Sequence, residues 1–125
     1  MNECIAVGFG GFIGAVLRYL ISLIPTEGGN SFPYKTLIIN ILGAFIIGII
    51  SATAQKYNID PHLLLFLKVG LCGGFTTFST FALETGDLLN SGNILSAFIY
   101  VLMSVVLCVA AVFAAQLIIF SAFSR

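Results

Sequence analysis

Long apolar stretches separated by short polar segments divide the chain into four parts. The apolar stretches cover about residues 4–24, 34–54, 61–84 and 94–122. A helix needs about 20 mostly apolar residues to cross the hydrocarbon core of a bilayer, and each stretch has about that length. The pattern predicts an all-α membrane protein with a single four-span domain over residues 1–125.

Turn and cap signals support these boundaries. Pro25 ends the first stretch, and the residues that follow it, 26–31, include glycines and polar residues typical of a loop. Asp60 precedes Pro61 in the order expected of a helix N-cap and a first helical residue. A short Asn90–Gly92 break precedes the last stretch, which is uncharged until Arg125.

The third stretch has an unusual centre. Gly70, Gly73 and Gly74 are followed by the segment 75–81, FTTFSTF, which alternates aromatic rings and hydroxyls. Paired glycines and successive threonines disfavour an uninterrupted helix. Because broken helices at mid-depth are characteristic of ion and substrate sites, we expect the third helix to be broken there.

Composition and charge narrow the class further. The chain is 59% hydrophobic and 8% charged, with a mean hydropathy of +1.12, which excludes an ordinary soluble protein. Its five basic and five acidic residues cancel, so the basic surface of a nucleic-acid binder is missing. The three cysteines, Cys4, Cys72 and Cys108, have no C-x-x-C spacing and are interpreted as free, buried thiols.

The positive charges give no clear orientation in the membrane. Lys56 and Arg125 belong to one side, Lys35 and the nearby Arg18 to the other, and Lys68 lies within the third stretch. A near-zero bias allows insertion in both directions, and hence an antiparallel dimer. Small residues at helical spacing favour close helix packing, within one chain or between copies; these pairs are Gly10/Gly14, Ala44/Gly48 and Gly70/Gly74.

Two polar residues inside apolar stretches are candidates for function. Asn40 must bond another helix or line a polar cavity, because an unpartnered buried amide is unfavourable. Thr36 precedes it by one turn on the same face. Arg18, the only cation of the first stretch, either extends to the membrane interface or attracts anions to a vestibule.

Aromatic rings and hydroxyls supply the other candidates. Phe78 and Phe81 are spaced i, i+3, with Thr80 among them, and ring edges and hydroxyl hydrogens together could replace water around a small anion. Tyr100 and Ser104 form a weakly polar stripe with Cys108, for which bonding between helices is the simpler explanation. No nucleophile and base pair can be assembled, so an enzyme is not expected.

These segments resemble the signature segments of the CrcB/Fluc family of fluoride channels. The resemblance rests on residues 10–19 (GGFIGAVLRY), 36–43 (TLIINILG) and 70–81 (GLCGGFTTFSTF), and it extends over the whole chain in order and length. It implies an antiparallel, dual-topology homodimer in the cell inner (plasma) membrane, with two pores that passively export fluoride from the cytoplasm.

The resemblance also implies roles for individual residues. Asn40 would coordinate fluoride, and Phe78 and Phe81 would turn their ring edges to the ion. A polar track would include Thr36, Tyr100 and Ser104, with Glu84 as a pore-associated carboxylate and Arg18 at the vestibule. Backbone carbonyls of Gly73 and Thr76 would hold a structural sodium ion on the dimer axis.

Two residues are not explained by this resemblance. Cys108 stands where the family's track can have a serine, and Lys68 has no assigned role.

Two other functions are possible for a chain of this pattern. A small multidrug-resistance exporter has a similar length and span number, but it needs a membrane-embedded carboxylate in span one, where this chain has Arg18 as its only charge. A structural assembly protein would leave Asn40 and the Thr/Phe cluster without a purpose.

Overall fold

The computed structural model describes residues 1–25 and 32–122, and within them every regular element is helical. Three long helices are α1 (Asn2–Ser22), α2 (Tyr34–Lys56) and α6 (Ile94–Ala122). Between α2 and α6 lie α3 (Pro61–Leu64), the π-helix η1 (Leu65–Cys72), α4 (Gly73–Phe75) and α5 (Phe78–Asn90). The loop expected at residues 26–31 and the terminal Arg125 lie outside the described residues.

Four helical stretches of the described chain are long and apolar enough to cross a membrane: Asn2–Ser22, Tyr34–Lys56, Pro61–Asn90 and Ile94–Ala122. The predictions of an all-α fold and of a multi-pass membrane protein are confirmed. The cap signal is confirmed as well, because Asp60 accepts a hydrogen bond from the backbone N–H of Leu63 at 2.9 Å, with Pro61 at the first helical position.

Two extended residues separate α4 from α5. Thr76 has φ −78° and ψ 157°, and Thr77 has φ −148° and ψ 114°, whereas the residues on either side are helical. The side chain of Thr77 then caps α5, accepting a hydrogen bond from the backbone N–H of Thr80 at 3.2 Å. Thr76 closes the preceding turn, because its hydroxyl donates to the Cys72 carbonyl at 2.8 Å.

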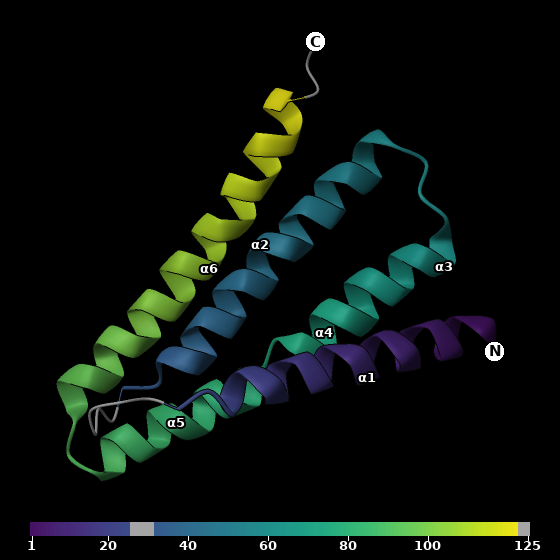
Figure 1. Ribbon diagram of the computed structural model, residues 1–125. Coiled ribbons are helices and arrows are strands. Elements are labelled where there is room, and N and C mark those ends of the chain that lie inside the picture. Colours follow the sequence, from purple (N-terminus) through teal and green to yellow (C-terminus); the bar gives the residue numbers. More distant parts are fainter. Residues whose placement is uncertain (26–31, 123–125) are drawn as a thin grey trace.

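Glycines let α1 lie against η1 and α4 with backbone touching backbone (Figure 1). A Cβ on Gly70 would lie 2.7 Å from the Val7 carbonyl oxygen and 2.9 Å from the Gly10 Cα atom. On α1, a Cβ on Gly14 would overlap the carbonyl oxygen of Leu71 in η1. The glycine spacing of the first and third stretches therefore serves packing within one chain.

The second pair of neighbours is α2 and α6, which run side by side (Figure 1). Gly48 of α2 fits against α6, where an added Cβ would lie 2.8 Å from the Ala115 Cβ. Near the other end of this pair, α5 joins them around a buried cluster of Leu37, Leu88, Ala97 and Tyr100. Large apolar side chains cover the outer faces, as lipid contact requires.

The cysteines are free, as predicted, but they are not all buried. Cys72 is buried, Cys108 is half-buried and Cys4 is exposed. The expectation for Cys4 was wrong, because this residue lies in the first turns of α1, where neighbouring side chains are exposed too.

Candidate functional site

A carboxylate joins three helices at one end of the molecule. Glu84 of α5 accepts a hydrogen bond from the Thr36 hydroxyl of α2 at its Oε1 atom and one from the Tyr100 hydroxyl of α6 at its Oε2 atom, each at 2.7 Å. Tyr100 is fully buried and Thr36 is 5% exposed. Hydrogen bonds to charged groups are stronger than those between neutral groups. Both donors therefore fix the position of the Glu84 carboxylate.

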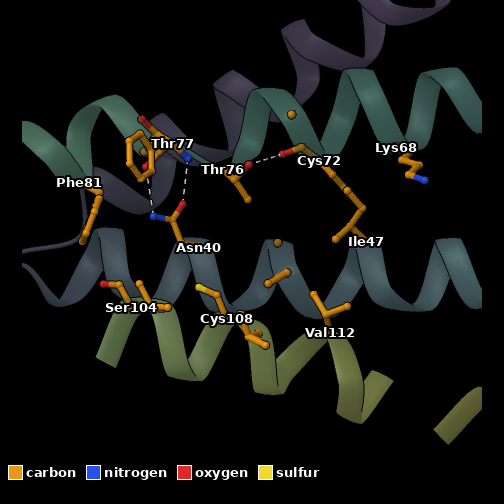
Figure 2. Close-up of a pocket in the computed structure, with 16 residues that line it drawn as sticks. Asn40, Ile47, Lys68, Cys72, Thr76, Thr77, Phe81, Ser104, Cys108 and Val112 are labelled. Carbon is orange, nitrogen blue, oxygen red and sulfur yellow. Dashed lines mark hydrogen bonds between the residues drawn. The ribbon is translucent and has the colours of Figure 1, made fainter. Parts of the chain in front are cut away.

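Asn40 bonds both backbone groups of Thr77. Its Nδ2 atom donates to the Thr77 carbonyl at 3.1 Å, and its Oδ1 atom accepts from the Thr77 N–H at 2.8 Å (Figure 2). Thr77 is one of the two extended residues, so its backbone N–H and carbonyl are outside the helical hydrogen-bond pattern and need other hydrogen-bond partners. The Asn40 side chain supplies them and, because an amide has two N–H groups and two lone pairs, half of its bonding capacity remains.

Beside Asn40 lies a cavity of about 530 Å³, which we call the main cavity. Its walls come from α2, α6 and the third helical stretch, and they are mostly apolar. Phe78 and Phe81 both line it, with ring centroids 5.4 Å apart and ring planes inclined at 44°. Phe78 is 80% exposed, whereas Phe81 also packs on the Tyr100 ring, with centroids 5.2 Å apart.

The stripe on α6 is divided between two environments. Tyr100 reaches Glu84, whereas Ser104 and Cys108 line the main cavity one and two turns later (Figure 2). The Ser104 hydroxyl oxygen is buried and has no hydrogen-bond partner within the part of the chain that the structure describes. Helix-to-helix bonding thus explains Tyr100 but not Ser104.

A second cavity of about 360 Å³, the charged cavity, adjoins the first. Arg18, Lys35 and Glu84 line it together with Thr36 and Thr80. Thr77 lines both cavities and therefore lies between them.

Arg18 and Lys35 also bond the backbone around the charged cavity. The Arg18 Nε atom donates to the Gly74 carbonyl at 3.2 Å, and the Lys35 ammonium donates to the Ser22 carbonyl at 2.8 Å. Arg18 therefore satisfies a carbonyl near the end of α4 rather than only extending to the interface. The close glycine contact between α1 and α4 brings the Arg18 side chain next to the Gly74 carbonyl.

The residues predicted from sequence thus fall into two neighbouring groups. Asn40, Phe78, Phe81, Ser104, Gly73 and Thr76 line the main cavity, and Arg18, Thr36, Thr80 and Glu84 line the charged cavity. Tyr100 joins the two groups through Glu84 and Phe81. Thr77 was not among the residues predicted for the site. An amide in an apolar span beside a suspected helix break was the signal that could have found it.

The chain is similar in sequence to known proteins over nearly its whole length. Residues 5–116 match the model of the family described as "CrcB-like protein, Camphor Resistance (CrcB)". A protein of Shewanella halifaxensis (strain HAW-EB4), named fluoride-specific ion channel FluC, is 43% identical over 124 residues, which is 98% of this chain and 100% of the relative. Proteins with the same name from Shewanella pealeana (strain ATCC 700345 / ANG-SQ1) and Shewanella baltica (strain OS185) are each 44% identical, over 98% and 97% of this chain and 100% and 98% of the relatives. The chain therefore belongs to the CrcB-like family.

Proposed function

We propose that this chain is a fluoride-selective ion channel that passively exports fluoride from the cytoplasm and so relieves its toxicity. It is a channel and not an enzyme. The observation that carries the proposal is the pair of cavities that meet at Thr77, one lined by Arg18, Lys35 and Glu84 and the other mostly apolar with a few weakly polar hydrogens in its walls. The relatives named as fluoride-specific channels support fluoride as the ion.

The main cavity offers donors that suit a small, strongly hydrated anion. The uncommitted N–H of Asn40, the hydroxyl of Ser104 and the positive edges of the Phe78 and Phe81 rings all belong to its walls. A buried hydroxyl without a partner is unfavourable by about 1–3 kcal/mol, and a fluoride ion would satisfy it. Because none of these four groups carries a full charge, they replace water without trapping the ion.

The charged cavity would act as a vestibule. Arg18 and Lys35 raise the local anion concentration there. Glu84 would repel an anion if it were free, but two hydroxyls donate to it and two cations share its cavity. Thr36, Thr80, Tyr100 and Ser104 would form the polar track from this vestibule to the main cavity.

We further propose that the channel is an antiparallel, dual-topology homodimer of one four-span domain in the cell inner (plasma) membrane. Phe78, a proposed ion-facing ring, is 80% exposed in the single chain. Gly73 is exposed, and a Cβ added to it would meet nothing within 4 Å. A second copy against this face would enclose the main cavity, with Thr76 and Thr77 as the mid-membrane break of the third helix.

A sodium ion at the dimer axis fits the residues present. Backbone carbonyl oxygens are hard ligands that suit a hard cation, and Gly73, the first residue of α4, is exposed. Gly73 and Thr76 of each copy would contribute one carbonyl each. The ion would supply a fixed positive charge between the two pathways.

The direct test is fluoride efflux from liposomes containing the purified protein, followed with a fluoride-selective electrode. We expect rapid efflux of fluoride and little efflux from matched chloride-loaded liposomes. Liposomes that lose fluoride no faster than protein-free controls would overturn the proposal. Proton-coupled export of organic cations instead would favour the multidrug-type alternative, which needs an embedded carboxylate where α1 has Arg18.

A further inference from the structure

Lys68 is a charged residue that has no role in the proposed fluoride pathway. It lies in η1, between Leu67 and Val69, two turns inside the third membrane-spanning stretch. An ionisable side chain within a spanning segment is unfavourable unless it is paired or faces an aqueous cavity. The Lys68 side chain has no hydrogen bond or ion pair with any other residue that the structure describes. Its position therefore needs an explanation other than pairing within the chain.

The side chain lines the main cavity. Lys68, Cys72 and Thr76 recur every four residues, and all three belong to the cavity wall. Figure 2 shows Lys68 at the end of this cavity opposite Phe81, on the helix that also carries Cys72. It is exposed, so its ammonium group remains accessible to water. Among the described residues that line the main cavity, Lys68 is the only charged one.

Charge is thus distributed in a simple way along the two cavities. Arg18 and Lys35 line the charged cavity on one side of Thr77, and Lys68 stands at the far end of the main cavity on the other side. The hydrogen-bond donors between them are uncharged, and the carboxylate of Glu84, beside Arg18 and Lys35 in the charged cavity, accepts hydrogen bonds from two hydroxyls. A cation at the mouth of a low-dielectric cavity focuses the potential and raises the local anion concentration.

We propose that Lys68 is a second anion-recruiting residue, which sets the rate at which fluoride reaches the main cavity from the end opposite Arg18. This inference rests on the proposed channel function. Lys68 does not coordinate the ion in the narrow region, where a full charge would trap it. It acts through long-range attraction, which salt screens over about 8 Å at physiological ionic strength and about 3 Å at 1 M.

Charge variants at this position test the proposal. Fluoride efflux is measured for the unaltered chain and for K68R, K68Q and K68E, in dilute buffer and again with about 1 M sodium gluconate, where the Debye length is about 3 Å. In dilute buffer we expect K68R to match the unaltered chain, K68Q to be several-fold slower and K68E slower still. In concentrated gluconate the four rates should converge.

The matched control is K56Q, which removes the same charge from the last turn of α2, outside both cavities. It should leave efflux within twofold of the unaltered chain. Equal rates for K68Q and the unaltered chain in dilute buffer would overturn the inference and leave the channel function standing. So would a K68Q defect that salt does not reduce, one that K68R shares, or an equal loss in K56Q. Absence of fluoride efflux from the unaltered chain would overturn both proposals.

Discussion

The side-chain amide of Asn40 on α2 bonds both the N–H and the carbonyl of Thr77, at 2.8 and 3.1 Å. One polar side chain thereby stabilises the extended backbone between α4 and α5 and still presents donor capacity to the main cavity. In this protein the residue expected to bind the ion also shapes the site. Substitutions at Asn40 will therefore affect both conduction and stability.

Asn40→Ala should abolish fluoride efflux and also lower the stability of the protein. The alanine removes a donor from the cavity and leaves two backbone groups of Thr77 unpaired, each unfavourable by about 1–3 kcal/mol. Efflux and thermal unfolding in detergent measure the two effects. Thr53→Ala is the matched control, because among the described residues the Thr53 hydroxyl bonds only the Ile49 carbonyl of its own helix, and Thr53 lies outside both cavities. Near-normal efflux in Asn40→Ala would show that Asn40 stabilises the fold but does not bind the ion.

Phe78→Ile and Phe81→Ile should both impair conduction, because isoleucine keeps apolar bulk but has no positive ring edge. A ring edge worth about 1.4 kcal/mol would correspond to about a tenfold slower efflux. Only Phe81→Ile should also lower stability, since Phe81 packs on Tyr100. Phe9→Ile, on the exposed face of α1, controls for the loss of a ring. Unchanged efflux in both variants would show that ring electrostatics is the wrong explanation.

Thr36→Val and Tyr100→Phe should each destabilise the protein by about 1.5–3 kcal/mol, because each removes a hydrogen bond to the Glu84 carboxylate. The two effects should not add, since both donors serve one group. A double-mutant cycle of unfolding free energies measures the coupling. Additive effects would show that the two hydrogen bonds to Glu84 contribute independently of each other.

Gly73→Ala should leave the single chain folded but weaken the dimer. Within one chain the added methyl group meets nothing within 4 Å, so a loss of dimer has to come from a second copy or from the proposed sodium ion. Gly8→Ala, at another glycine with open space around it, is the control. Dimer content by size exclusion and efflux after exchange of sodium for N-methylglucamine are the measurements. A dimer unaffected by the substitution and by sodium removal would exclude the axial sodium site.

The fold was largely predictable from the sequence because apolar length alone sets the number of possible spans. The ends of the third stretch were less clear. The third span was predicted over about residues 61–84, and the helix that carries Glu84 continues to Asn90. Nothing in the residue pattern indicated the π-helix from Leu65 to Cys72.

The sequence predicted most residues of the candidate site but not the hydrogen bonds that they make. An amide inside an apolar span needs a hydrogen-bond partner, and this requirement singled out Asn40. Its partner is the backbone of Thr77. Sequence alone does not reveal which backbone groups lack a helical hydrogen bond, so this partner could not be predicted. The hydrogen-bond partner of Arg18 was not predictable either, because its bond to the Gly74 carbonyl depends on the close approach of α1 and α4.

Fluoride efflux with and without a pH gradient tests the central claim most directly. No carboxylate or histidine lines the main cavity among the described residues, and Glu84 is held by two hydroxyl donors, so the path has no evident proton carrier. Passive conduction predicts that fluoride leaves liposomes down its own gradient at the same rate whether or not a pH gradient is present. Efflux that requires a proton gradient would contradict the channel account.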